Sequence, residues 1–277
     1  MAFDGITIAN IVKELNDTIL NGRIAKIAQP ENDELLLTIK PAKGQVRLVI
    51  SASASLPLIY LSRDNKPSPM TAPNFCMLLR KHIANGRIVG ISQPSLERII
   101  RFEIEHLDEL GDLCRKSLIV EIMGKHSNII FCNEKGMIID SIKHVSAQMS
   151  SVREVLPGRE YFIPDTMKKE NPLGIPEENF TQELLSKPMS VGKAIYNSFT
   201  GISPVVIDKL SVTAQAIGIA ITKIVPGENK LTVSGTAKPN ERITLSTVPE
   251  GTNVIAVSDA NGNFVAELVR GAGVYTA

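Results

Sequence analysis

The feature that most constrains the fold of this chain is a segment that occurs twice. The first copy reads Asn21-Gly22-Arg23-Ile24, followed by Ile27 and Gln29-Pro30; the second reads Asn85-Gly86-Arg87-Ile88, followed by Ile91 and Gln93-Pro94. Every matched position is separated by the same 64 residues, so no insertion falls between the matches. A gap-free repeat ties two segments to one supersecondary shape. The sequence therefore predicts a domain with two related halves.

An apolar pattern of helical period precedes each copy. The pattern consists of Ile8, Ile11, Val12, Leu15 and Ile19 in the first copy, and of Phe75, Leu78, Leu79 and Ile83 in the second. Each helix is expected to end at its Asn-Gly, because glycine tolerates the left-handed conformation that terminates helices. Pro73 suits a first-turn position. The predicted unit is a helix, an Asn-Gly stop, a strand, a Gln-Pro turn and a second strand.

The remaining signal up to residue 142 is largely β. Strands are predicted at Leu35–Ile39, Val46–Ser51, Leu58–Leu61, Ile99–Ile104, Leu118–Ile122, Asn128–Phe131 and Met137–Ile142. Glycines and a proline separate them. Two β-rich halves, each led by a helix, predict an α+β fold built on a two-part β-sandwich or half-barrel with flanking helices.

Composition and pattern divide the chain into three parts. Residues 1–165 form the predicted repeat-bearing domain, residues 166–225 a proline-bearing linker and a partial helix-hairpin-helix region, and residues 226–277 a β-rich tail. The apolar stretch Val212 to Ile221 is predicted as helical and is too short to span a bilayer. The tail alternates in short strands, Lys230–Val233, Arg242–Leu245, Asn253–Val257 and Asn263–Leu268. The pattern is typical of a small β-sandwich, but four strands are too few to close one. The tail resembles part of an immunoglobulin-like repeat.

The net charge and the cysteine content limit the cellular compartment and the classes of partner that the sequence favours. Thirty basic and twenty-nine acidic side chains give a net charge of +1, so contact with a polyanion requires a local patch. The three cysteines contain no C-x-x-C, which argues against disulfides and a zinc site and favours a reducing cytosol. Asp4, Lys13 and Glu14 interrupt any secretory signal. We expect a cytoplasmic protein without a metal or cofactor.

The densest polar cluster in an apolar context runs from Glu121 to Asn128. In one interpretation it is a turn, with Gly124 relaxing the backbone while Ser127 and Asn128 bond to main-chain groups. In the other, Lys125 and His126 present donors to a phosphate while Ser127 and Asn128 fix the loop. The residues alone leave both interpretations open.

A second set of charged residues is predicted to form a mixed surface near the repeated turns. It comprises Asp4, Arg23, Arg80, Lys81, His82, Arg87, Glu97 and Arg98. For Arg80, Lys81 and His82 a solvated helix face is the alternative. Adjacent strand residues point to opposite faces, so Glu97 and Arg98 are expected to differ, one tethered inward and the other projecting outward. An arginine held in this way reads a phosphate or a base edge.

Nothing in the sequence pairs a nucleophile with a base. The four histidines are scattered, and neither H-E-x-x-H nor G-x-S-x-G occurs. Aromatic residues make up 4% of the chain and tryptophan is absent, which disfavours a stacking platform for single strands. The chain is expected not to be an enzyme.

Several short motifs together carry a resemblance to a known family. They are Met1 to Gly5, the Gln29-Pro30 pair, Phe75 to His82, Gln93 with Glu97-Arg98-Ile99, Gly111-Asp112, Glu121 to Asn128, Asp140 to His144, Arg153 with Leu156-Pro157-Gly158, and Thr200 to Pro204. Over about residues 1–210 the chain resembles the N-terminal domain of the NFACT family. Bacterial members were described as fibronectin-binding proteins and act in ribosome-associated quality control.

The resemblance implies a fold, partners and site residues. The family's domain is similar to the N-terminal module of formamidopyrimidine-DNA glycosylases and precedes a helix-hairpin-helix region. Members bind the large ribosomal subunit carrying a stalled nascent chain, recruit alanyl-tRNA and support template-free tailing, with bond formation left to ribosomal RNA. The family's Asp-Arg pair corresponds to Glu97-Arg98, and a second family aspartate to Asp4. Together with the charged residues singled out above, the predicted tRNA-binding residues are Asp4, Glu97, Arg98, Arg80, Lys81, Arg87, Lys125 and His126.

Two other function classes compete with this interpretation. A DNA glycosylase is suggested by the fold, but it needs an N-terminal proline amine, and this chain offers Ala2. A fibronectin-binding adhesin is suggested by the older description of the family and by the immunoglobulin-like tail. Because that tail stands where the family has a coiled coil and an RNA-binding domain, the chain is expected to be a fragment, a chimera or a degenerate relative with reduced tailing activity.

Overall fold

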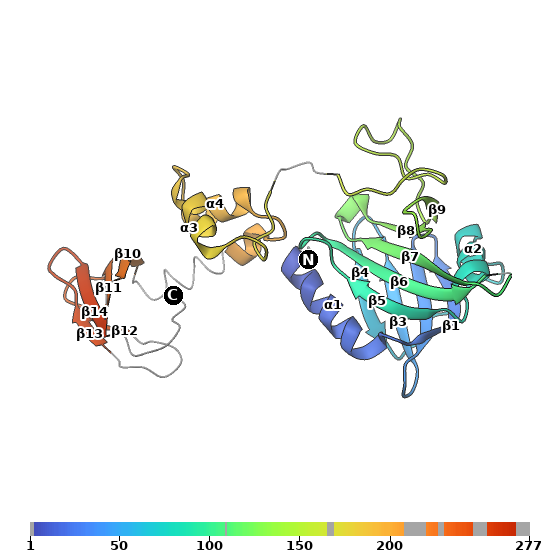
Figure 1. The fold of residues 1–277 in the computed structure, drawn as a ribbon, viewed down its shortest axis with the longest axis horizontal. Helices are drawn as coiled ribbons and strands as arrows, with labels where there is room; N and C mark the ends of the chain where they lie inside the picture. Colours follow the sequence, from blue (N-terminus) through green and yellow to red (C-terminus); the bar gives the residue numbers. More distant parts are fainter. Residues whose placement is uncertain are drawn as a thin grey trace. The chain divides into compact units, whose positions relative to one another are not determined.

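A computed structural model describes residues 3–108, 110–164, 169–207, 220–226, 230–245 and 254–269. Its contacts divide the chain into two compact units, Met1–Ser203 and Pro204–Ala277. The first unit contains helices α1 (Gly5–Ile19), α2 (Asn74–Ile83), α3 (Glu177–Leu185) and α4 (Val191–Ser198), and the 3-10 turn η1 (Gly124–His126). Its strands are β1 (Arg23–Glu31), β2 (Glu34–Lys40), β3 (Val46–Ser51), β4 (Leu58–Ser62), β5 (Arg87–Ser92), β6 (Ile99–Leu107), β7 (Leu113–Glu121), β8 (Asn128–Cys132) and β9 (Ile138–Ser141) (Figure 1).

All nine of these strands form one antiparallel sheet in the order β4-β3-β2-β1-β5-β6-β7-β8-β9. Each half of the repeat therefore runs outward from the centre, where β1 and β5 lie side by side. The two Asn-Gly turns exchange equivalent hydrogen bonds at this junction. The Asn21 N–H donates to the Ile88 carbonyl at 2.8 Å, and the Asn85 N–H donates to the Ile24 carbonyl at 2.9 Å. The predicted two related halves are confirmed, and they contact each other through reciprocal hydrogen bonds.

The Asn-Gly pairs end their helices in a way that differs from the prediction. The left-handed residue is the asparagine, with φ 63° at Asn21 and 61° at Asn85. Asparagine adopts this conformation more readily than most residues. The glycine is needed for space, since a Cβ on Gly22 would lie 2.7 Å from a methyl of Ile39 and one on Gly86 would lie 2.8 Å from a methyl of Ile104.

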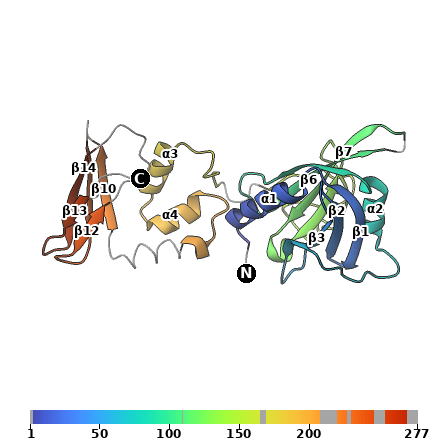
Figure 2. The ribbon, with the colours of Figure 1, turned by 90° about the horizontal axis from the view of Figure 1, so that it is seen from below.

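Each repeat helix packs on the strand of the other half. Helix α1 lies against β5, and α2 lies against β1. Equivalent side chains make these contacts: Asn16 Nδ2 donates to the Ile91 carbonyl at 2.9 Å, and Arg80 Nε donates to the Ile27 carbonyl at 2.9 Å. Figure 2 shows the two helices at opposite margins of the sheet. The exchange interlocks the halves.

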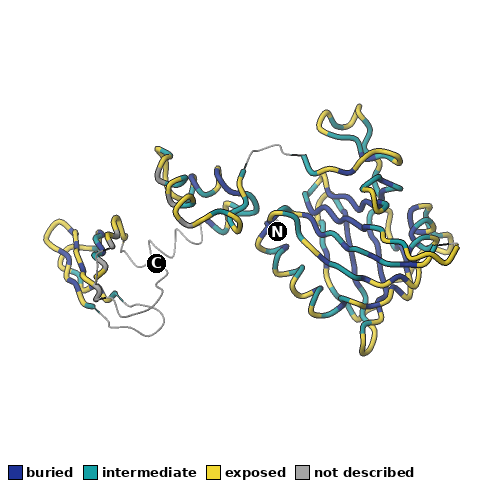
Figure 3. The backbone as a smooth tube through the Cα atoms, in the orientation of Figure 1, coloured by how far each residue is buried: buried dark blue, intermediate teal, exposed yellow. Residues whose placement is uncertain are grey.

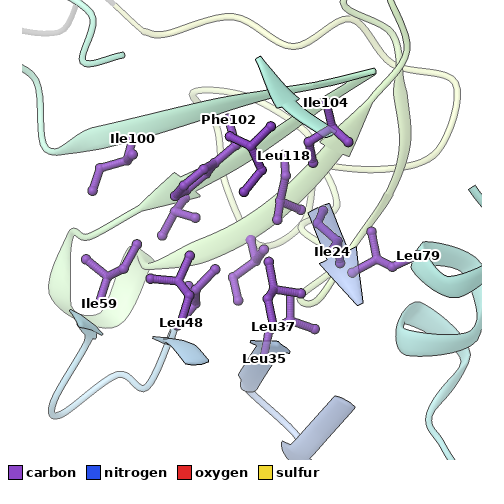
Figure 4. Packing of buried hydrophobic residues seen from close by; sticks show 14 of the residues in the cluster. Ile24, Leu35, Leu37, Leu48, Ile59, Leu79, Ile100, Phe102, Ile104 and Leu118 are labelled. Carbon is purple, nitrogen blue, oxygen red and sulfur yellow. The ribbon is translucent and has the colours of Figure 1, made fainter. Parts of the chain in front are cut away.

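The sheet curls so that its two halves enclose one core. In Figure 4, Leu35 and Leu48 of the first half face Ile100 and Phe102 of the second. All four side chains are at most 1% exposed and belong to one hydrophobic cluster. The strands are buried along most of their length, while the connecting loops are exposed (Figure 3). The α+β fold predicted from the sequence, built on a half-barrel with flanking helices, is confirmed.

The Gln-Pro pairs do not form the hairpin turns that the sequence predicts. Gln29-Pro30 lies inside β1, and the turn falls at Asn32-Asp33, between the paired residues Glu31 and Glu34. Gln93-Pro94 lies in the loop that follows β5. Proline removes one backbone donor but fits at the end of a strand, so strand β1 continues through it.

The helical region and the tail are smaller structures. Helices α3 and α4 are held by stacking of Phe180 on Phe199, with ring centroids 4.6 Å apart. In the second unit, β10 (Ala220–Pro226), β11 (Lys230–Thr236) and β14 (Asn263–Val269) form one sheet, and β12 (Arg242–Leu245) pairs with β13 (Val254–Val257). Ala220 and Ile221 begin β10, so the helix predicted there is wrong at its end; residues 212–219 lie outside the described residues.

Candidate functional site

The pair Glu97-Arg98 lies in the loop between β5 and β6, one residue before β6 begins. Two residues of this loop adopt the left-handed conformation, Ser95 with φ 44° and Leu96 with φ 58°. The Gln93 amide holds the loop from inside, because Nε2 donates to the Glu97 carbonyl at 2.9 Å and to the Gly5 carbonyl at 2.8 Å. Gln93 of the second Gln-Pro pair therefore holds the β5–β6 loop in place through its side-chain amide.

The two members of the pair have different surroundings. Glu97 is half-buried, and its Oε1 accepts a hydrogen bond from the Thr200 hydroxyl at 3.0 Å. Arg98 is exposed, and within the described part of the chain its guanidinium has no hydrogen bond or ion pair. One side chain is tethered inward and its neighbour projects outward, as predicted, although both precede the strand. An exposed, unpaired guanidinium is available to a phosphate.

The backbone places Lys125 and His126 at the same end of the sheet as Arg98. The Ile122 N–H donates to the Arg98 carbonyl at 2.8 Å, and η1, which contains Lys125 and His126, begins two residues later. Both side chains are exposed. Three cationic or potentially cationic side chains therefore lie at one end of the β6–β7 pair.

Ser127 and Asn128 fix this turn, as both sequence interpretations expected. Ser127 Oγ accepts from the Met123 N–H at 2.8 Å. Asn128 Nδ2 donates to the Lys143 carbonyl at 2.9 Å, while its Oδ1 accepts from the Ile129 N–H at 2.9 Å. Because both side chains are buried, their role is structural. No hydrogen bond or ion pair with another described residue engages the exposed side chains of Lys125 and His126.

Asp4 has a different environment from the surface position that the sequence predicts. It is 7% exposed and caps α1, with Oδ1 accepting from the Thr7 N–H at 2.8 Å. Its Oδ2 accepts from the Ser203 hydroxyl at 2.8 Å. Burial opposes ionisation, but the hydrogen bonds from Thr7 and Ser203 outweigh it and lower the pKa of Asp4. Asp4 joins α1 to the segment after α4, and the prediction that it lies on the mixed-charge surface is wrong.

The remaining cations predicted for the site lie at the other end of the sheet. Arg87 pairs with Glu105 at 3.0 Å, and Glu105 is six residues along β6 from Ile99, about 20 Å at the usual rise per strand residue. Arg80 donates to the Ile27 carbonyl, and Lys81 is exposed at the carboxyl end of α2. The single mixed surface predicted from the sequence is therefore two separate groups, because the Asn-Gly turns lie at the far end of β6 from Arg98.

Sequence reasoning missed a buried ionic cluster behind η1. Glu121, at the end of β7, is 1% exposed and forms an ion pair with Arg153. The Tyr161 hydroxyl also donates to Glu121, at 2.9 Å, and the Arg153 guanidinium lies 5.3 Å from the centre of the Tyr161 ring. A glutamate at the end of an apolar strand was the available signal, since a buried carboxylate needs a cation.

The described residues limit what the site can hold. No cluster of three or more histidine, cysteine, aspartate or glutamate side chains suited to a metal ion occurs among them. None of the described helices combines the length and the apolar character needed to cross a membrane.

Comparison with known proteins places the chain. The sequence profile described as the NFACT N-terminal and middle domains matches residues 4–225. The chain belongs to the NFACT family. This NFACT chain is 39% identical over 205 residues to the Rqc2 homolog RqcH of Bacillus subtilis, a match that covers 74% of the chain and 36% of that protein. It thus spans about a third of this relative's length.

More distant relatives point in the same direction. The mouse ribosome quality control complex subunit NEMF is 21% identical over 207 residues, which cover 74% of the NFACT chain and 18% of that protein. Among solved structures, the N-terminal domain of fibronectin-binding protein PavA from Streptococcus pneumoniae superposes with a TM-score of 0.72 at 33% identity, over 78% of this chain and 80% of that one. The chain's homologues are ribosome quality control proteins, and its fold is that of the fibronectin-binding-protein N-terminal domains.

Proposed function

We propose that this chain is the RNA-binding part of a cytoplasmic ribosome-associated quality control factor. It binds tRNA, alanyl-tRNA by family resemblance, and the large ribosomal subunit carrying a stalled nascent chain, and so supports template-free alanine tailing. The names of the relatives support the quality control role. The observation that supports tRNA binding is the exposed guanidinium of Arg98, which pairs with no other described residue and lies at the same end of the sheet as Lys125 and His126.

The arrangement suits a phosphate backbone contact. A guanidinium presents a planar fork of donors to phosphate oxygens, and an ammonium adds a mobile point charge. The overall charge of +1 supplies little long-range attraction, so binding depends on this local group. The chain holds and orients the RNA, and peptide-bond formation is left to the ribosome.

Binding of tRNA to the purified chain tests the proposal. Fluorescence anisotropy with an alanine tRNA transcript should give an affinity that falls steeply with salt. Replacing Arg98 by alanine should weaken binding about tenfold and reduce the salt slope by about one. The matched control is Arg242→Ala, which removes the same charge from β12, outside the family match. Absence of tRNA binding at low salt, or equal affinities for wild type and Arg98→Ala, contradicts the proposal.

The ribosomal partner needs its own measurement. The chain should co-sediment with large subunits that carry peptidyl-tRNA, more than with empty subunits, and Arg98→Ala should reduce that difference. Equal sedimentation with both kinds of subunit would argue against recognition of a stalled complex.

Fibronectin binding is the second candidate, because the similar solved structure is of a fibronectin-binding protein. The same two variants distinguish the candidates. An adhesin should bind immobilised fibronectin with an affinity that Arg98→Ala leaves unchanged, and should not bind tRNA.

A further inference from the structure

Three backbone segments meet beside Arg98 with no room for a side chain between them. They belong to the start of α1, to the loop before β6 and to the turn after α4. A Cβ on Gly5 would lie 2.1 Å from the Leu96 carbonyl oxygen and 2.6 Å from the Cα of Gly201. A Cβ on Gly201 would lie 2.6 Å from the same oxygen. Only glycine at both positions permits this approach.

Hydrogen bonds fix the contact on each side. The Gly5 N–H donates to the Gly201 carbonyl at 2.8 Å. The Thr200 hydroxyl donates to Glu97, and the Ser203 hydroxyl donates to Asp4. Three hydrogen bonds thus join Thr200, Gly201 and Ser203 to the start of α1 and to the loop before β6, so the Thr200–Ser203 turn is a fixed junction.

The same turn is anchored to the helical region at its other face. The Thr200 N–H donates to the Glu170 carbonyl at 2.9 Å, and Glu170 forms an isolated parallel bridge with Phe199. Phe199 in turn stacks on Phe180 of α3. A displacement of the helical region would therefore be transmitted to Thr200 and its neighbours.

The β5–β6 loop, which contacts the Thr200–Ser203 turn, has a strained backbone. Leu96 is 6% exposed and adopts φ 58°, a conformation that a bulky side chain rarely takes. Such a conformation persists only when the surroundings impose it. Here the surroundings are Gly201 on one side and the Gln93 amide on the other. Arg98 follows two residues later, so its direction depends on this constraint.

We infer that the Thr200–Ser203 turn is a positioning device for Arg98. It holds the Ser95–Glu97 loop in its left-handed conformation and keeps Glu97 turned inward, so that the Arg98 guanidinium stands free. Thr200 and Gly201 are positioning residues, and neither touches the RNA. The inference rests on the proposed function, because it assigns to the helical region control over how the chain grips tRNA.

The coupling runs in both directions. If the turn favours the loop conformation that binds RNA, bound RNA must favour the docked turn by the same free energy. Binding of tRNA at Arg98 is thereby connected to the placement of the helices that follow.

Glutamate at position 97 has a specific part in this device. Its carboxylate reaches the Thr200 hydroxyl at 3.0 Å, and it also contributes to the electrostatic surroundings of Lys169. Aspartate is one methylene shorter and would fall short of Thr200 without a backbone shift. The longer side chain at this position therefore matches the threonine across the junction.

Two variants of the full chain test the inference. Gly201→Ala inserts a methyl group against the Leu96 carbonyl, and Thr200→Val removes only the hydroxyl; Thr200→Ser is the conservative control that keeps it. We expect Gly201→Ala to weaken tRNA binding about tenfold, the loss expected for Arg98→Ala. Thr200→Val should weaken it by a smaller factor, and Thr200→Ser should bind like the wild type. Introducing Gly201→Ala into Arg98→Ala should produce no further loss.

A second measurement needs no RNA, and it keeps the inference testable if Gly201→Ala folds poorly. In Thr200→Val, amide hydrogen exchange should be faster at two backbone N–H groups. These are the N–H of Glu97, which donates to the Pro94 carbonyl, and the N–H of Ile122, which donates to the Arg98 carbonyl. Exchange at Ile50, in the middle of β3, should stay unchanged as the folding control.

The outcomes separate the two proposals. If the exchange rates change as expected but the wild type binds no tRNA, the proposed function is wrong and the control of the loop by the turn stands without its RNA role. If the rates at Glu97 and Ile122 do not change in Thr200→Val, or if the effects of Gly201→Ala and Arg98→Ala on binding are independent, the positioning role is overturned.

Discussion

Replacing Arg153 by methionine should destabilise the first unit more than most single substitutions. Arg153 donates to both carboxylate oxygens of Glu121, and its Nη1 donates to the Phe162 carbonyl at 2.7 Å. The Glu121 side chain is 1% exposed and that of Arg153 is 14% exposed. Methionine keeps much of the volume and removes the charge, so the change leaves a buried carboxylate with the Tyr161 hydroxyl as a remaining donor.

The magnitude follows from the burial of the pair. Removing one partner of a buried ion pair costs about 3–5 kcal/mol, because the other charge is left uncompensated. In a domain of this size each kcal/mol lowers Tm by about 2–4 °C, so the expected fall is roughly 6–20 °C. Glu121→Gln in the same background removes the stranded charge while keeping an acceptor for Tyr161. The double variant should therefore be less destabilised than the sum of the two single variants.

Urea denaturation and thermal melts of the four proteins, wild type, two single variants and the double variant, supply the assay. A matched surface control is Arg159→Met, since Arg159 also pairs with a glutamate but is largely exposed. Such a pair contributes at most about 1 kcal/mol. The reasoning is refuted if Arg153→Met costs no more than this control, or if the two substitutions in the Glu121–Arg153 pair are additive.

Two further predictions concern titratable groups. Hydrogen bonds that outweigh burial lower the pKa of Asp4, so the ionised carboxylate stabilises the fold above its unfolded pKa, and that contribution disappears as pH falls through the lower folded pKa. The unfolding free energy of the wild type should decline below about pH 4 more steeply than that of Asp4→Ala, which at pH 7 should lose about 1 kcal/mol with the helix cap; parallel pH curves from urea denaturation would show that the carboxylate is not coupled to folding. Burial raises the pKa of the Cys132 thiol to about 12 and also raises that of Cys76, so at pH 8 both should resist a thiol reagent until urea is added, and rapid labelling of either in the native protein would mean that this part of the core opens readily.

The sequence predicted the elements well where their signal is local. The periodic apolar residues of α1 and α2 and the alternating strands of the sheet all appear at the expected positions. Which strands pair and which strand each helix covers depend on contacts between residues far apart in the sequence, and these were not predicted. The periodicity of α1 says that one face is buried but cannot say that β5 buries it.

The candidate site shows the same limit. The different surroundings of Glu97 and Arg98 were predicted from the alternation of strand residues, but the pair precedes β6 and the Thr200 hydroxyl is what holds Glu97 inward. The burial of Asp4 did not, because its partner Ser203 lies 199 residues away in the chain. Arg87 was grouped with Arg98 because both were expected near the repeated turns, yet β6 carries the chain back through the sheet and puts the length of a strand between them.

The exchange of helices between the two halves has a consequence for synthesis. A chain emerges from the ribosome at about 5–20 residues per second, so α1 waits several seconds before β5 exists to cover it. During that interval the first copy presents an open apolar face, and contacts this distant in sequence form late. The amino-terminal half therefore depends on its successor to become stable. The first half of the sheet is therefore incompletely folded when it leaves the ribosome, and it completes its core only when the second half has followed.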